Sequence, residues 1–168
     1  MAELHQAERL QPCLLDRLTD DEPNATQESR EKRVMSLSRY RAAVLRDLEW
    51  LFNARAPAAR SGLEGAELVS ASVLNYGLPD LCGMTASSLA AEGIERQVLE
   101  AIRNFEPRLL RHSLAVSVLP PADDSPHSTI AFEIRGELWA QPMPERLYIK
   151  TELDLETGRC QLGERTGG

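Results

Sequence analysis

The change of pattern at Pro107 constrains the fold of this chain more than any other feature of its sequence. Before it, apolar residues recur at helical spacing up to Phe105; after it, they alternate as in a strand. Proline fixes its own φ and disfavours the α region for the preceding residue, so Glu106 is predicted to end the helix. Glu106 and Arg108 then flank a stiff turn. That turn either displays the two charges, held apart, to a partner, or is a solvated turn with a weak ion pair.

Two amphipathic helices and about three strands are predicted around this junction. The helices cover residues 38–53 and 88–104, where apolar side chains recur every three to four residues. Alternation of apolar with other residues predicts strands near 114–118, 130–138 and 147–155. The fold class is therefore α+β, with two core helices packed on a small antiparallel sheet, a meander of about three strands. Such a sheet leaves two edges that can pair with another chain.

The chain is expected to divide into a leader, one domain and a tail. Residues 1–37 are predicted to form an N-terminal helical leader and linker, because leucines recur at helical spacing over residues 10–18 ahead of a polar stretch. Residues 38–160 form a single α+β domain, and residues 161–168 a flexible tail. The leader helix either packs on its own domain or docks into a partner's groove, since both use the same apolar spacing. Between the two core helices, Tyr76 is expected to hold a turn against the core.

Charge and composition argue against several classes of function. The net charge is −7 and both ends of the chain are acidic, whereas a nucleic-acid-binding surface needs clustered bases. Cys13, Cys82 and Cys160 lack CxxC spacing and the three histidines are scattered, so neither a disulfide framework nor a metal or cofactor site is predicted. The sequence shows no signal-peptide pattern and no apolar run of membrane-spanning length. We therefore expect a cytoplasmic protein without direct membrane insertion.

The sequence offers little evidence for catalysis. It has no GxSxG, HExxH, P-loop or Rossmann glycine pattern. A glycosidase needs two converging carboxylates, and the candidates here are Glu106, Asp80, Glu133 and Glu137. Among 26 acidic residues such a pair arises by chance, and Arg108 near Glu106 favours the ionised carboxylate, which is unsuited to a general acid. A protein-binding role without enzymatic activity is therefore expected, with no catalytic residue.

Several separated motifs occur in the order found in one family of proteins. They are Leu14-Leu15-Asp16-Arg17-Leu18, Tyr40-Arg41, Val44-Leu45-Arg46-Asp47-Leu48-Glu49-Trp50-Leu51, Ser72-Val73-Leu74-Asn75-Tyr76-Gly77-Leu78-Pro79-Asp80, Phe105-Glu106-Pro107-Arg108-Leu109, Gly136-Glu137-Leu138-Trp139 and Thr151-Glu152-Leu153-Asp154-Leu155-Glu156-Thr157-Gly158. From about residue 10 to 160, the chain resembles the TssE baseplate proteins of bacterial type VI secretion systems. That family is similar to the small "lysozyme-like" wedge subunit of contractile phage-tail baseplates.

The resemblance implies a structural role in a cytoplasmic baseplate, assembled at the cytoplasmic side of the inner membrane. Glu106, Pro107 and Arg108 are the protein-binding residues it implies, clasping the helical core bundle of the TssF and TssG wedge subunits. It further implies that the sheet offers an edge, in the strands near 128–139 and 146–155, for the first TssB–TssC sheath strand, which would add by β-augmentation. TssK is a further candidate partner. The alternative function is a peptidoglycan hydrolase acting through Glu106.

Overall fold

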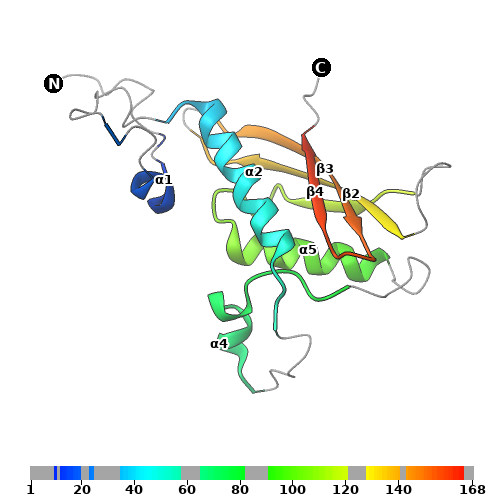
Figure 1. Ribbon diagram of the computed structural model, residues 1–168. Coiled ribbons are helices and arrows are strands. Elements are labelled where there is room, and N and C mark those ends of the chain that lie inside the picture. The colour runs from blue at the N-terminus through cyan, green and yellow to red at the C-terminus, as the bar shows by residue number, and fades with distance from the viewer. Residues whose placement is uncertain are drawn as a thin grey trace.

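A computed structural model describes most of the chain: residues 10, 12–19, 23–24, 35–57, 65–81, 91–120, 128–140 and 143–164. Two long helices, α2 (Leu37–Asn53) and α5 (Ala91–Phe105), pack against a four-stranded antiparallel sheet. Figure 1 shows α2 running across the sheet, with α5 beside it and the short helix α1 (Leu14–Leu18) at the edge of the molecule. The predicted α+β class is confirmed. Within the described residues, no helix has both the length and the apolar character that crossing a membrane requires.

Helix α2 starts one residue before the predicted helix and ends at the predicted residue. Its N-cap is Ser36, whose hydroxyl accepts a hydrogen bond from the backbone N–H of Arg39 at 3.3 Å. The helix ends at Asn53, and its C-cap Ala54 has an extended backbone conformation. Its buried side is made of Tyr40, Ala43, Val44, Leu48, Leu51 and Phe52. This is the apolar stripe that the sequence places on one side of the helix.

Helix α5 presents one apolar face to the core and ends at Phe105, two residues before Pro107. The buried residues of this face are Ile94, Val98, Ala101 and Ile102. Phe105 is the last helical residue, although the N–H of Glu106 still donates to the carbonyl of Ile102 at 2.9 Å. Glu106 is thus the boundary predicted from the following proline. Residues 88–90, where the sequence predicts the helix to begin, lie outside the described residues.

The sheet is a four-stranded meander rather than one of about three strands. The strands β1 (Ala115–Val118), β2 (Thr129–Leu138), β3 (Glu145–Asp154) and β4 (Cys160–Glu164) lie side by side in sequence order. The fourth strand escaped prediction because it offers only two alternating apolar residues and contains Gly163, a residue disfavoured in strands. Strand β4 reaches Glu164 and so enters the segment 161–168, which is predicted to be a flexible tail.

One face of the sheet is apolar and covered, and the other is polar. Paired residues such as Ile130 with Leu153 and Ile134 with Ile149 lie on the covered face, where both helices contribute to the same core. Charged residues including Glu133 occupy the opposite face. The two-residue period of a strand explains both faces, because successive side chains point to opposite sides.

The loop after α2 is tied back to the end of that helix. It contains two short elements, α4 (Glu67–Ser70) and η3 (Val73–Asn75). Gly77 has φ +123°, and an added Cβ would lie 2.4 Å from the carbonyl oxygen of Ala54, so glycine is required at this close approach. The ring of Tyr76 packs edge-on against Phe105, with ring centroids 5.3 Å apart. Tyr76 therefore holds this turn against the core, as the sequence predicts.

Candidate protein-binding site beside the helix–strand junction

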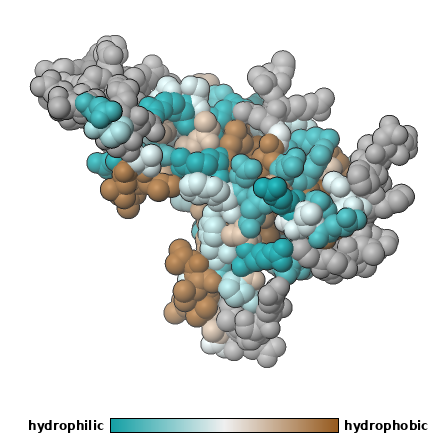
Figure 2. Space-filling view, viewed as in Figure 1, coloured by the Kyte–Doolittle hydropathy of each residue, from teal (hydrophilic) through white to brown (hydrophobic). Residues whose placement is uncertain are grey.

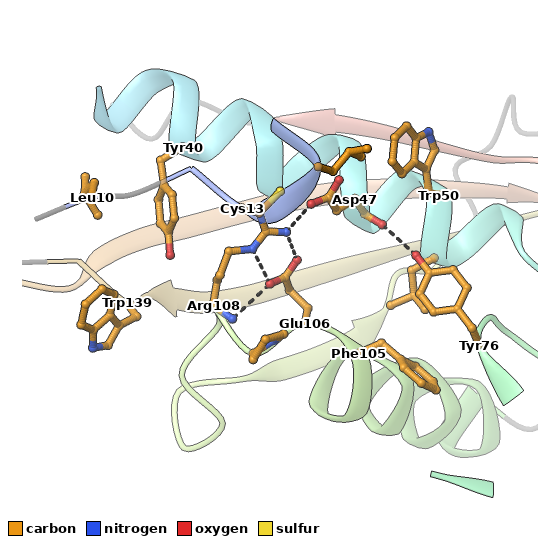
Figure 3. A pocket seen from close by; sticks show the side chains of 13 residues that line it. Leu10, Cys13, Tyr40, Asp47, Trp50, Tyr76, Phe105, Glu106, Arg108 and Trp139 are labelled. Atoms are coloured by element: carbon orange, nitrogen blue, oxygen red, sulfur yellow. Dashed lines mark hydrogen bonds and ion pairs between the residues drawn. The ribbon is translucent and has the colours of Figure 1, made fainter. Parts of the chain in front are cut away.

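A cavity of about 710 Å³ opens beside the Glu106-Pro107-Arg108 motif. Its lining comes from the leader, α2, the loop after α2, the junction that follows α5, and the end of β2 (Figure 3). The lining residues are Leu10, Cys13, Leu15, Tyr40, Asp47, Trp50, Leu51, Tyr76, Phe105, Glu106, Pro107, Arg108 and Trp139. The fold thus brings together the three site residues predicted from the sequence with ten that were not predicted as site residues.

Aromatic side chains are concentrated around this cavity. The chain has eight Phe, Trp and Tyr residues, and five of them line the cavity: Tyr40, Trp50, Tyr76, Phe105 and Trp139. Both tryptophans are about half exposed, at 51 % for Trp50 and 47 % for Trp139. Large, partly exposed aromatic residues beside an arginine are the composition typical of protein-binding hot spots.

Glu106 and Arg108 hold each other instead of being held apart. The Arg108 backbone N–H donates to Oε1 of Glu106 at 3.1 Å, the guanidinium Nε donates to the same oxygen at 2.7 Å, and Nη2 donates to Oε2 at 2.5 Å. Glu106 is only 3 % exposed. The expectation that the turn displays the two charges separately is therefore wrong, and so is the alternative of a solvated turn. The side chains converge because both lie on the same side of the Pro107 turn (Figure 3).

Asp47 of α2 extends this pair into a longer chain of charges. Nη2 of Arg108 donates to Oδ2 of Asp47 at 2.6 Å. The other oxygen of Asp47 accepts from Nε of Arg46 at 2.9 Å, and Nη1 of Arg46 donates to Asp16 at 2.6 Å. Acids and bases therefore alternate from the leader helix to the junction: Asp16, Arg46, Asp47, Arg108 and Glu106.

The surroundings of Arg108 keep its guanidinium charged. Burial by itself would lower the pKa of Arg108, but the hydrogen bonds and charge of Glu106, followed by those of Asp47, raise that pKa above its ordinary value. Burial also raises the pKa of the Tyr40 hydroxyl, which lines the same cavity. The site thus combines fixed charges with neutral aromatic rings.

Asp47 was not predicted as a site residue, although the sequence holds a weak signal for it. It lies three residues after the buried Val44 and four before the buried Leu51, so its side chain falls beside the apolar stripe of α2. An acid in that position needs a basic or hydrogen-bonding partner once the helix packs against the core. Its partner, Arg108, lies 61 residues away in the sequence. The tertiary fold therefore decides which base Asp47 meets.

The leader helix α1 lies at the rim of the cavity and buries little of its own apolar surface. Leu14 and Leu18 are 72 % and 74 % exposed, and Leu15 is 43 % exposed although it lines the cavity. Figure 2 shows a brown, hydrophobic patch at the position that α1 occupies in Figure 1. The anchors of the leader are the Asp16–Arg46 ion pair and the buried Leu10, whose carbonyl accepts from the N–H of Met35 at 3.0 Å.

The carboxylates considered for hydrolysis do not converge. Asp80 pairs with Arg55 at 2.9 Å. Glu133 lies on the polar face of the sheet, where it accepts hydrogen bonds from Arg135 and Tyr148, and Glu137 shares that face. Glu106 lies on the side of the sheet that the helices cover, and Arg108 stands between it and Asp47. Among the described residues, no three His, Cys, Asp or Glu side chains form a group that could hold a metal ion.

Among the strands that the structure describes, β1 and β4 are the two edge strands of the sheet. The two strands that the resemblance points to, near 128–139 and 146–155, are β2 and β3, which are the interior strands of the sheet, β3 pairing with β4 over Ile149–Leu153, so this expectation is corrected. Helix side chains engage both edges: Glu95 of α5 accepts from the N–H of Val118 at 2.8 Å. Asn53 of α2 binds both the N–H and the carbonyl of Cys160, each at 3.0 Å.

Comparison with known protein families gives a match that spans this site. The family model described as "Baseplate wedge protein gp25" matches residues 38–143, which is more than half of the chain. The chain belongs to this family. The gp25 match runs from the second residue of α2 to the connection before β3, and so includes the Glu106-Pro107-Arg108 motif. Searches among curated proteins and solved structures gave no match.

Membership of the gp25 family indicates a structural role in a phage-tail-like baseplate, in contact with other baseplate and tail components. The family relationship predicted from the sequence is thereby confirmed. The family is one of structural baseplate proteins, which favours a role without enzymatic activity over hydrolysis through Glu106.

Proposed function

We propose that this protein is a TssE-type wedge subunit of a type VI secretion baseplate, assembled at the cytoplasmic side of the inner membrane. In this role it joins the TssF and TssG core bundle through the cavity beside Glu106-Pro107-Arg108, with TssK as a further neighbour, and provides a sheet edge for the TssB–TssC sheath. One observation carries the proposal: within the segment that matches the gp25 family, the motif lies against an aromatic-lined cavity large enough to receive side chains of a partner.

The internal ion pairs change what the motif contributes to binding. Because Glu106 and Arg108 already satisfy each other, their role is to fix the shape of one wall of the cavity. A wall set before the partner arrives loses little conformational entropy on binding. The contact area itself comes from Pro107 and the half-exposed Trp50 and Trp139.

For the sheath strand, we propose the edge of β4. Asn53 binds the backbone groups of Cys160, so these groups point away from β3. Backbone orientation repeats every second residue, so the N–H and carbonyl of Leu162 point away from β3 as well. On the opposite side, α5 packs along β1 and Glu95 already accepts the outward N–H of Val118. Helix α5 packs more extensively on β1 than α2 does on β4, so β4 leaves more room for an incoming strand.

Complementation in cells tests the proposal. In a strain lacking the gene, wild-type protein is expected to restore secretion and sheath formation, whereas the double variant Trp50→Ala, Trp139→Ala is not. Leu68 is 90 % exposed and is absent from the cavity lining, so Leu68→Ala is the matched apolar control and should complement fully. Secretion restored equally by all three proteins would refute the proposed site.

A further inference from the structure

The charge of the cavity is unbalanced. Its lining contains two acids, Asp47 and Glu106, and one base, Arg108. Arg46 bridges Asp47 and Asp16, so the whole ion-pair chain contains three acids and two bases and keeps one net negative charge. The remaining lining is apolar or aromatic, and the unmatched negative charge therefore acts in surroundings that screen it less than water does. The whole chain, at −7, adds a field of the same sign.

Asp47 is the acid that an incoming group can reach. Its side chain is 22 % exposed, against 3 % for Glu106. Each oxygen of Asp47 already accepts from one arginine, but a carboxylate offers about four acceptor positions in all. Another donor can therefore bind it without displacing Arg108.

The aromatic walls are suited to the same kind of group. The guanidinium carbon of Arg46 lies 5.0 Å from the ring centre of Trp50, which is cation–π geometry at this rim. Trp139, at the other end of the cavity in Figure 3, presents a half-exposed ring to an incoming side chain. A carboxylate would gain no such attraction from the ring faces, which carry partial negative charge.

We propose that the cavity receives an arginine or lysine side chain, carried on an otherwise apolar segment of the partner protein. The cation contacts Asp47 and an aromatic face, and the apolar part of the segment fills the remaining volume. This inference rests on the proposed function, because it names the chemistry of the wedge partner's contact. Arg108 itself is not the group that binds a carboxylate of the partner, because Glu106 and Asp47 already bind it.

Intrinsic fluorescence tests this directly, because both tryptophans of the chain line the cavity. The full-length protein is titrated with two blocked amphipathic peptides of leucine, alanine and glutamine that differ at one position, arginine in one and glutamate in the other. The arginine peptide is expected to bind about fivefold or more tightly than the glutamate peptide, the size of a partly buried ion pair with a cation–π contact. Equal affinities, a preference for glutamate, or no fluorescence change with either peptide would overturn the inference.

Single-residue variants test whether the preference for the arginine peptide arises in the cavity. Asp47→Asn should remove most of the preference for arginine, whereas Glu152→Gln, the same charge change on the polar face of the sheet, should leave it intact. If Asp47→Asn does not fold, Trp139→Leu replaces it, since it leaves the ion pairs untouched and should also reduce the preference. A peptide preference unchanged in the cavity variant would contradict the assignment. Failure of the wild-type protein to complement secretion would instead count against the proposed function.

Discussion

Arg108 and Asp47 lie 61 residues apart in the sequence and are joined by a 2.6 Å ion pair that fixes the helix–strand junction to α2. Through Asp47, the junction is also linked to Arg46 and to Asp16 of the leader. The Glu106-Pro107-Arg108 motif is therefore a structural part of the domain as well as a surface. Substitutions in the motif are therefore expected to affect both the stability of the domain and its binding surface.

Arg108→Ala is predicted to destabilise the isolated protein, because it leaves Glu106 buried without its cationic partner. Removing one partner of a buried ion pair costs about 3–5 kcal/mol. Urea denaturation should show this loss relative to wild type. Arg146→Ala, on the polar face of the sheet, should stay within about 0.5 kcal/mol, as surface substitutions usually do. Equal stability of the two variants would mean that the internal pair is unimportant.

The leader leucines are predicted to matter for assembly and not for the stability of the domain. Leu14→Ser and Leu18→Ser should change the free energy of unfolding by less than about 0.5 kcal/mol, because both side chains are mostly exposed. Leu48→Ala, at a fully buried position, should cost about 2–5 kcal/mol. Denaturation curves decide between the two fates of the leader. A large loss in the leader variants would show that it packs on its own domain.

Cys160 is predicted to make the stability fall at alkaline pH. Burial raises the pKa of its thiol from 9.0 to about 12. Between these values the unfolded chain releases the proton and the folded chain keeps it, so the stability present below pH 9 is lost as the pH rises toward 12. Burial raises the pKa of Tyr40 and Tyr76 too and adds a loss of the same sign. The measurement is therefore the difference in slope between wild type and Cys160→Ala; parallel pH profiles would contradict the prediction.

Proline substitutions in the two edge strands test which edge of the sheet receives the sheath strand. The N–H groups of Leu162 in β4 and Val116 in β1 both point away from the neighbouring strand, by the same two-residue period that orients Cys160 and Val118. Proline at either position therefore removes no hydrogen bond of the sheet, but it blocks strand addition. Leu162→Pro is predicted to prevent sheath formation while retaining TssF and TssG, and Val116→Pro to permit it. The opposite pattern would assign the sheath to β1.

Hydrolysis of peptidoglycan is predicted to be absent. Arg108 binds both oxygens of Glu106, and Glu106 is only 3 % exposed, so this carboxyl group is not available to a substrate, as a general acid has to be. Purified protein should release no soluble fragments from labelled peptidoglycan. Release by wild-type protein that is lost in Glu106→Gln would revive the hydrolase.

The elements with a regular pattern could be predicted from the sequence. Strict alternation placed β2 and β3, and the apolar stripe placed α2, because these periods depend on local geometry alone. Strand β4 is short and contains Gly163, so its pairing with β3 is decided by the sheet and not by its own sequence.

The candidate site could be predicted only in part. Proline at 107 marks the junction, but the directions of the Glu106 and Arg108 side chains follow from packing against α2. The choice of Asp47 over the other acids of the chain is likewise a tertiary outcome. The fold brings Trp50 and Trp139 to the same cavity, and their spacing in the sequence does not indicate that they lie close together.

The affinity of the purified protein for the TssF–TssG complex tests the central claim most directly. Trp139→Ala removes a half-exposed wall of the cavity without touching the ion pairs, and Leu68→Ala removes an exposed apolar side chain elsewhere. The cavity account predicts that Trp139→Ala weakens binding about tenfold or more, as expected for a hot-spot residue, and that Leu68→Ala leaves it nearly unchanged. Wild-type affinity in Trp139→Ala would contradict it.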